Sequence, residues 1–294
     1  MTKIFAVGAA LCVLAGSTMT FAGEPGAPLG SAIPRAGFFI GLGGSYNSVA
    51  FDQDLYAIGL SDVYSGTTLV ARGHAEGPAD SFHTRQARFS PEAQLGYFRN
   101  FGDSNWLWGA KFKYKYSGTE ATDRGMIVPQ NGSQIPTNGS PPTPLAGNAI
   151  IESSKTSIDH ELSMLAFLGR SFFNTTVYLG VGPVLFGTKS SLNNAIGFAS
   201  INGMPTDITG APISFSSSKW MWGTAAQIGT TYYFSPSWFL DFNYTYAIAG
   251  QYKNDYGAPF VSSSDGRTYS GVAFITTSQR VTSQSLAVSL NKMF

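Results

Sequence analysis

The stretch WLWGAKFKYKY, residues 106–116, alternates strictly between two kinds of side chain. Five of its six even-numbered residues are aromatic, whereas its odd-numbered residues are leucine, glycine and three lysines. A period of two is that of a β-strand, whose successive side chains point to opposite faces. Ten residue steps span about 33 Å along a strand, or roughly 25 Å along a membrane normal at a tilt of about 40°. The segment therefore predicts a membrane-crossing strand with its aromatic face toward lipid.

The same alternation recurs in seven more segments. They are residues 37–48, 88–98, 159–168, 177–186, 220–234, 238–248 and 282–294. One face of each segment is large and apolar and the other is mostly small or polar, which is the pattern of a lipid-facing barrel with a filled interior. Hydrocarbon offers no hydrogen-bond partner to an open sheet edge, so the strands must close on themselves. We therefore predict an all-β fold, a transmembrane antiparallel up-and-down β-barrel of eight strands, over residues 37–294.

The connections between these segments alternate between short and long. The short ones are residues 99–105, 169–174 and 235–237, and the long ones are residues 49–87, 117–158, 187–219 and 249–281. Outer-membrane barrels have short periplasmic turns and long extracellular loops, so the long connections are predicted to be external. Residues 126–149 are uncharged and rich in Pro, Gly, Ser and Asn. This composition predicts a flexible, hydrated loop.

The last long connection contains Asp265-Gly266, a pair that favours a tight hairpin turn. Such a hairpin either extends the barrel beyond the membrane or adds a pair of membrane strands. A barrel of ten or twelve strands is therefore the alternative to eight.

The composition excludes several other classes of protein. Only 12% of the 294 residues are charged, 14% are aromatic and the mean hydropathy is +0.01, values that fit neither a helical membrane protein nor a disordered chain. Residues 1–22 resemble a signal peptide, with Lys3, an apolar run and Thr20-Phe21-Ala22 before the expected cleavage site. Cleavage would leave a lead at residues 23–36, remove Cys12 and bring the net charge from +1 to zero. A neutral chain gives no support for nucleic-acid binding.

Charged residues recur on the face predicted to line the lumen. The four bases are Arg88, Lys111, Lys113 and Lys115, and the four acids are Glu92, Asp159, Glu161 and Asp241. The short turn between the second and third segments should bring Glu92 opposite Lys111 or Lys113. Buried charges persist when they are paired and hydrogen-bonded, so a balanced set predicts a plug inside a small barrel. A charge-lined ion path is the alternative.

Aromatic residues are expected to form two girdles at the membrane interfaces. The periplasmic girdle would contain Tyr97, Trp106, Trp108, Tyr232 and Trp238, and the external girdle Tyr114, Tyr116, Trp220, Trp222, Tyr244 and Tyr246.

The eight segments and the terminal Phe294 resemble small Gram-negative outer-membrane barrels of the OmpA-like and opacity-protein type. Leu286, Val288 and Leu290 alternate before Phe294, and this resemblance implies a C-terminal signal for the barrel-assembly machinery. Lys292 departs from that pattern. Pro91 and Pro183 lie within predicted strands, where each loses a ladder hydrogen bond, so we expect bulges there or a strand that begins at Pro91. The resemblance implies a monomer in the outer membrane, in contact with lipid and lipopolysaccharide.

Catalytic and cofactor signals are weak. Asp80-Ser81-Phe82-His83 has the residue types of a hydrolase, but it falls in a predicted mobile loop without a fixed partner. Asp159 and His160 are adjacent, so alternation should send them to opposite faces. No spacing predicts a metal or cofactor site.

Three functions remain, in decreasing order of support from the sequence. The first is a surface barrel with a plugged lumen that binds host or environmental ligands through its long loops, in the manner of an adhesin or antigen. The second is a narrow porin-like channel for ions or small solutes, and the third is an outer-membrane hydrolase.

Overall fold

The computed structural model describes residues 33–201 and 204–294. The predicted signal peptide, residues 1–22, and most of the predicted lead lie outside the described residues. Within the described part of the chain, no helix has the length and apolar character needed to cross a membrane.

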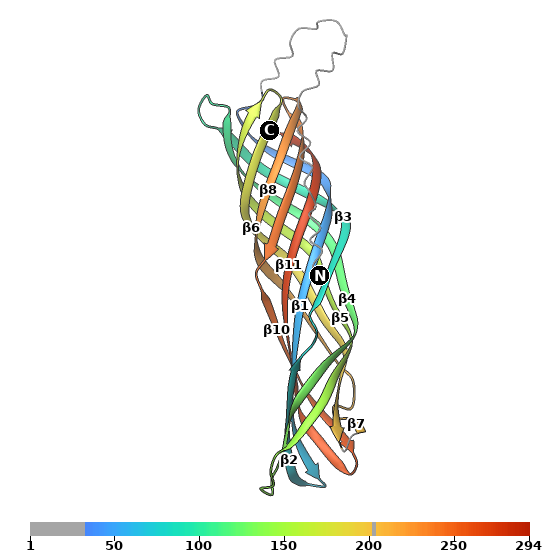
Figure 1. The fold of residues 1–294 in the computed structure, drawn as a ribbon. Coiled ribbons are helices and arrows are strands. Elements are labelled where there is room, and N and C mark those ends of the chain that lie inside the picture. Colours follow the sequence, from blue (N-terminus) through green and yellow to red (C-terminus); the bar gives the residue numbers. More distant parts are fainter. Residues whose placement is uncertain (1–32, 202–203) are drawn as a thin grey trace, which may run out of the picture. The chain divides into compact units, whose positions relative to one another are not determined.

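The described residues form β-strands joined by tight turns (Figure 1). The strands are β1 (Ala36–Ser65), β2 (Thr68–Pro78), β3 (Phe82–Asn100), β4 (Trp106–Pro136), β5 (Thr143–Phe172), β6 (Thr175–Ile201), β7 (Met204–Asp207), β8 (Ile213–Ser235), β9 (Trp238–Ala249), β10 (Tyr252–Ser264) and β11 (Arg267–Met293). All sheet pairings among the described residues are antiparallel, and each of the eight predicted segments lies mainly within one strand.

Eight of these strands close into a ring in the order β1, β3, β4, β5, β6, β8, β9, β11 and back to β1. The predicted eight-stranded barrel is therefore confirmed. If the paired residue is followed from strand to strand around the ring, the path that starts at Phe38 of β1 returns to β1 at Ser48. This displacement of ten residues along β1 is the shear of the barrel. A shear of ten residues over eight strands gives a tilt within the usual range of about 35–45° and an interior that side chains fill.

The ring continues beyond its eight-stranded part as an extension made largely of the same strands. In this extension β2 takes the place of β3 between β1 and β4, and β10 takes the place of β9 beside β11. The prediction of long external loops is wrong in this respect, because most of their residues form strands. Residues 126–149 in particular were expected to be flexible, yet β4 and β5 pair from Gln134 and Thr143 down to the ring. Cross-strand pairing outweighs the loop-like composition of this segment.

The hairpin predicted at Asp265-Gly266 joins β10 to β11 and extends the barrel rather than adding membrane strands. Both residues have positive φ, 53° and 71°, as a two-residue hairpin turn requires. The bulges expected at Pro91 and Pro183 are wrong. Each proline lies inside a strand with a regular partner, Gly44 and Thr224 respectively.

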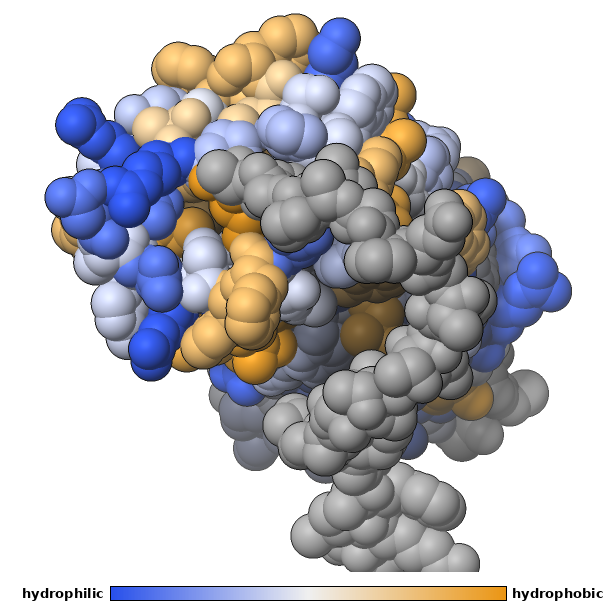
Figure 2. Space-filling model, turned by 90° about the horizontal axis from the view of Figure 1, so that it is seen from above, coloured by the Kyte–Doolittle hydropathy of each residue, from blue (hydrophilic) through white to orange (hydrophobic). Residues whose placement is uncertain are grey.

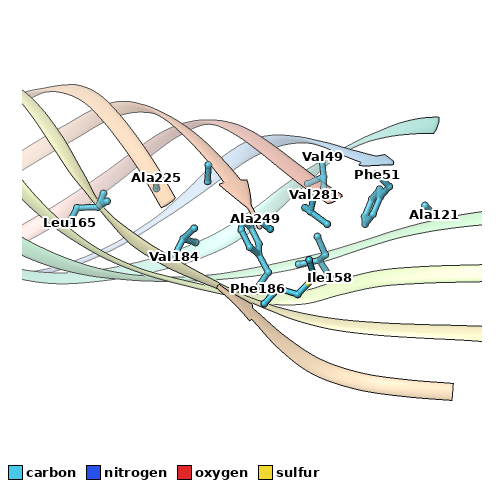
Figure 3. Packing of buried hydrophobic residues seen from close by; sticks show 12 residues of the cluster. Val49, Phe51, Ala121, Ile158, Leu165, Val184, Phe186, Ala225, Ala249 and Val281 are labelled. Atoms are coloured by element: carbon cyan, nitrogen blue, oxygen red, sulfur yellow. The ribbon is translucent and has the colours of Figure 1, made fainter. Parts of the chain in front are cut away.

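The interior of the ring and extension is filled by alternating apolar and polar layers. The turn-end layer contains Phe39, Phe98, Leu107, Tyr233, Phe239 and Met293. Next comes the charge layer, described below, and then the middle apolar layer around Phe51, Ile158, Val184, Phe186 and Val281 (Figure 3). A polar layer of Gln53, Ser154, Thr156, Ser190 and Gln279 follows. The outer apolar layer around Leu55, Val128, Ile151 and Leu192 fills much of the extension.

Large apolar side chains also cover the outside of the ring. Leu42 is 71% exposed, Leu286 62% and Met164 60%, values that only a lipid or protein partner would make favourable. The end that carries the short turns differs, because Arg99, Asp103 and Arg170 are exposed there beside apolar residues. Figure 2, which looks onto this end, shows hydrophilic and hydrophobic residues side by side.

Candidate functional site

The charge layer is the most specific polar arrangement in the ring, and its innermost pair is Lys111 with Asp241. Their Nζ and Oδ2 atoms lie 3.2 Å apart, and the two side chains are 3% and 2% exposed. The Tyr178 hydroxyl donates to Asp241 Oδ1 at 2.6 Å, and Lys111 Nζ donates to the same hydroxyl at 2.7 Å. Gln94 adds an Nε2 donor at 3.1 Å from Asp241. Each charge is therefore both paired and hydrogen-bonded.

The other two lysines of β4 have acid partners of their own. Lys113 Nζ lies 3.5 Å from Glu92 Oε1, and Lys115 Nζ lies 2.8 Å from Glu161 Oε2. All four side chains are at most 7% exposed. Asn243 and Asn47 accept further hydrogen bonds from Lys113 and Lys115. Lysines that point inward at every second position of β4 thus meet acids from β3, β5 and β9.

Arg88 was predicted to belong to this layer, and that prediction is wrong. β3 pairs with β4 only as far as Glu92 opposite Lys115, beyond which β4 bulges between Tyr116 and Thr119. Arg88 lies on the exposed edge of β3 beyond that point, where its guanidinium donates to the Gly118 carbonyl. It bridges the two strands at the place where they separate.

The prediction for Asp159 is also wrong. A bulge between Ile158 and His160 interrupts the alternation of β5, so that Glu161 points inward but Asp159 does not. Asp159 instead pairs with the exposed Lys189 at 2.7 Å. This contact raises the pKa of Lys189 above its ordinary value, because the ammonium donates to the carboxylate.

The segment that contains His83 was expected to be a mobile loop without a partner, which is wrong. His83 lies in β3 opposite Asp52, and its Nδ1 is 2.8 Å from Asp52 Oδ1. Ser81 donates to Asp54 at 2.6 Å rather than to the histidine. A hydroxyl that is not bonded to the imidazole is not activated by it, so this surface cluster does not form the nucleophile–base pair of a hydrolase.

His160 lies outside the barrel among aromatic residues. Its Nδ1 is 3.0 Å from the Tyr114 hydroxyl, and its ring stacks on that of Trp220 with a centroid distance of 6.3 Å. Histidine is suited to this position because its ring packs flat while its nitrogens form hydrogen bonds. Alternation predicted this outward direction for His160, because Glu161 beside it points into the lumen.

The residues predicted for the girdles and for the C-terminal signal all point outward. Ten of the eleven predicted girdle residues are exposed, with Tyr97 half-buried between Phe38 and Trp108. Leu286, Val288, Leu290 and Phe294 are also exposed on the outer face. Lys292 packs against the rings of Trp238 and Phe294, at 5.8 and 5.3 Å from their centroids, so its charge does not interrupt the apolar surface.

The polar layer was missed by the sequence reasoning. Gln279 donates to Thr156 and Ser190, each at 3.1 Å, and Gln53 donates to Ser154 at 2.8 Å. These residues are uncharged, and a search for paired charges does not find them. Continued alternation through residues 49–55 and 275–281 was the signal that could have found this layer.

A polar groove of about 570 Å³ lies on the outside of the extension across β4, β5, β6 and β8. Six serines and the ion pairs Lys155–Glu120 and Lys189–Asp159 line it. Among the described residues, no group of three or more His, Cys, Asp or Glu side chains is placed to hold a metal ion.

No family model matches the chain. Over its whole length it is 27% identical to outer membrane protein P1 of Coxiella burnetii (strain RSA 493 / Nine Mile phase I), across 299 residues and 98% of that protein.

Three solved barrels overlay in part. Ail, the attachment invasion locus protein of Yersinia pestis, has 12% identity and a TM-score of 0.24, covering 81% of this chain and 98% of that chain. Neisserial surface protein A has 14% identity and a TM-score of 0.28, covering 83% of this chain and 99% of that chain. The Escherichia coli outer membrane protease OmpT has 10% identity and a TM-score of 0.34, covering 88% of this chain and 97% of that chain. Likeness at this level bears on neither ligand nor activity.

The full-length similarity to an outer membrane protein agrees with the closed ring of eight strands and its exposed apolar band. An outward apolar band around a barrel with a polar interior is the pattern of transmembrane β-barrels. This chain is an outer-membrane β-barrel protein.

Proposed function

We propose that the protein is a surface barrel of the OmpA-like or opacity-protein type, with a plugged lumen and an external extension that contacts partners. The observation that carries this proposal is the layered filling of the interior. The three buried lysine–carboxylate pairs are followed by the middle apolar layer, in which Phe186 and Val281 are fully buried. An ion that entered would have to break paired charges and then cross apolar packing, and neither step is favourable.

Conductance tests this proposal against the narrow channel. The refolded protein is inserted into a planar bilayer beside a Lys113→Glu variant, with folding checked by heat-dependent gel mobility. We expect no steady openings from the wild type. Well-defined openings whose ion selectivity changes in the variant would establish a pore and overturn the plug.

The extension supports a role in contacts outside the membrane. From Ala50 to Ser65, β1 continues for fifteen residue steps, about 50 Å along the strand and roughly 38 Å along the axis at a tilt of about 40°. We propose that its polar groove contacts the saccharide part of lipopolysaccharide or of neighbouring cells. The serine hydroxyls suit hydrated, hydroxylated partners because they both donate and accept hydrogen bonds.

A variant of the groove tests this contact. Replacement of Ser216 and Ser218 by valine should weaken binding of the refolded protein to immobilised lipopolysaccharide, and the same change at Ser263 and Ser270, outside the groove, should not. Equal binding by all variants would place the contact elsewhere.

We also propose that the exposed girdles anchor the barrel in lipid as a monomer and that the residues ending at Phe294 are recognised by the barrel-assembly machinery. Replacement of Phe294 by serine should reduce the amount of protein assembled in the outer membrane without affecting refolding in detergent. Replacement of Phe173, which is also exposed and lies in a turn, is the control. Normal assembly of the Phe294 variant would refute this role.

A further inference from the structure

The outer apolar layer does not close completely. It contains a cavity of about 70 Å³, with walls from β1, β2, β4, β5, β6, β8, β10 and β11. Among the described residues that line it, none is Asp, Glu, Lys or Arg, and Ser61, His74, Gln130 and Thr209 have the only polar side chains. Because few groups on its walls can hold a water molecule, the cavity favours apolar occupants.

Small residues at inward positions create this cavity. Ala57, Ala149 and Ala195 are buried in the outer apolar layer, and all three line the cavity. Protein interiors are usually packed as densely as organic crystals. A void beside three alanines in this layer is therefore a feature of the extension that needs a reason.

The wall of the cavity has one seam. Sheet pairing runs continuously from β10 through β11, β1, β2, β4, β5 and β6 to β8. Among the described residues, no sheet pairing joins β8 to β10. Three residues of the cavity wall, Ile213 and Phe215 of β8 and Phe260 of β10, belong to the two strands that face each other across this seam.

Side chains alone hold the seam. The Ser217 hydroxyl donates to Asn254 Oδ1 at 3.0 Å, and the rings of Phe215 and Tyr256 lie with their centroids 5.3 Å apart. The Lys219 ammonium lies 5.1 Å from the centre of the Tyr252 ring. The two strands can therefore part by rotation of a few side chains, without loss of any sheet hydrogen bond.

We propose that this cavity binds an alkyl chain, which enters through the seam between β8 and β10. An apolar cavity of about 150 Å³ takes up benzene, so the present volume admits about three carbon atoms. A longer chain requires Phe215 and Phe260 to move and enlarge the cavity. The walls supply dispersion contacts and no charge, which selects a hydrocarbon segment over a polar solute. A free fatty acid and the acyl chain of a membrane lipid share this chemistry.

Modification of engineered cysteines tests where the ligand binds. Cys12 is the only cysteine of the chain, so its replacement by serine leaves each engineered cysteine as the only reactive thiol. Ala149→Cys places a thiol in the cavity wall, and Ala247→Cys places one in the filled middle apolar layer as the matched buried control. The full-length refolded protein, held in amphipol, is treated with hexyl methanethiosulfonate and with a trimethylammonium analogue. We expect the hexyl reagent to modify Cys at 149 more than about tenfold faster than at 247, because the packed layer excludes it. The charged reagent should be slow at both positions.

Decanoic acid then serves as the probe ligand. At about ten times its dissociation constant, occupancy of the cavity should slow hexyl modification of the Ala149→Cys variant about tenfold. Protection without added decanoic acid, in phospholipid vesicles but not in amphipol, would identify membrane acyl chains as the source. No protection by either source, or equal reactivity at both buried positions, would overturn the proposal.

The seam has a separate test. In the Cys12→Ser background, Ser217→Cys with Asn254→Cys should form a disulfide across the two strands. We expect this bond to abolish uptake of tritiated decanoic acid by the otherwise unchanged cavity and reductant to restore it. Unchanged uptake in the oxidised protein would rule out entry between β8 and β10. None of these results depends on whether the lumen conducts ions.

Discussion

Removal of the Asp241 carboxylate should destabilise the barrel more than removal of one partner of a surface ion pair does. In Asp241→Leu, Lys111 remains buried and loses its charged partner 3.2 Å away, together with the hydrogen bond that Tyr178 donates to the acid. Loss of one member of a buried pair costs about 3–5 kcal/mol. Lys111 keeps its contact with the Tyr178 oxygen, so we expect a value near the lower limit, about 3 kcal/mol.

The double variant Lys111→Met with Asp241→Leu separates the charge from the packing. Replacement of a whole buried pair by apolar residues of similar volume is often neutral, so the double variant should recover most of the lost stability. The coupling energy between the two sites should then be about 2–3 kcal/mol. Urea unfolding of the refolded protein in lipid vesicles, followed by tryptophan fluorescence, measures all four corners of the cycle.

The Lys155–Glu120 pair supplies the matched control. Its atoms are 2.7 Å apart, closer than those of Lys111 and Asp241, but the side chains are 44% and 48% exposed. Exposed pairs contribute about 1 kcal/mol or less, because water screens them. A coupling energy for Lys111 and Asp241 no larger than that of this control would refute the view that buried pairing holds the charge layer together.

Three further predictions concern other parts of the fold. Phe186→Ala should lower the free energy of unfolding by about 3–4 kcal/mol, because its side chain is fully buried in the middle apolar layer; urea unfolding checks this. Gly43→Ala should lower the free energy of unfolding by about 2 kcal/mol or more, since its Cβ would lie 2.1 Å from a backbone oxygen of β11. In Gly59→Ala the new Cβ meets nothing closer than 3.9 Å, so this control should refold normally when tested by heat-dependent gel mobility. Burial raises the pKa of Tyr256, so the folded state holds this phenolic proton more tightly than the unfolded state does, and stability should fall as the pH rises above 10. In Tyr256→Phe that fall should be shallower; an unchanged slope in alkaline unfolding curves would contradict the assignment.

The sequence predicts the ring well because alternation is a local property that the barrel preserves. Each segment with a large apolar face became part of a strand, and the short turns between them set which strands are neighbours. The partners across the lumen are not local. Lys111 and Asp241 are 130 residues apart in the sequence. The alternation of each strand predicts that both side chains point into the lumen, but it does not indicate that they form a pair.

Bulges explain the two charges that were misplaced. One extra residue reverses the direction of every side chain that follows, so parity counted through a bulge gives the wrong face. This happened near Asp159, and the bulge in β4 parts the strands beside Arg88. The tendency to bulge depends on how neighbouring strands fit together, which one chain segment does not reveal.

The change of polarity along the outer face shows where the membrane barrel becomes a water-exposed one. On β1 the outward residues are Leu42 and Tyr46 in the ring but Asp52 and Asp54 further along, while inward residues such as Phe51 and Leu55 stay apolar. In the ring, the outer face is apolar and the interior contains the charge layer. In the extension, acids appear on the outer face beside exposed apolar residues such as Tyr56 and Leu60, and the interior contains uncharged layers. The same strands therefore present an outer face suited to lipid along the ring and one suited to water along the extension. The outer apolar layer and its cavity lie in this second part, where outward acids such as Asp52 and Asp54 indicate that water rather than lipid surrounds the strands.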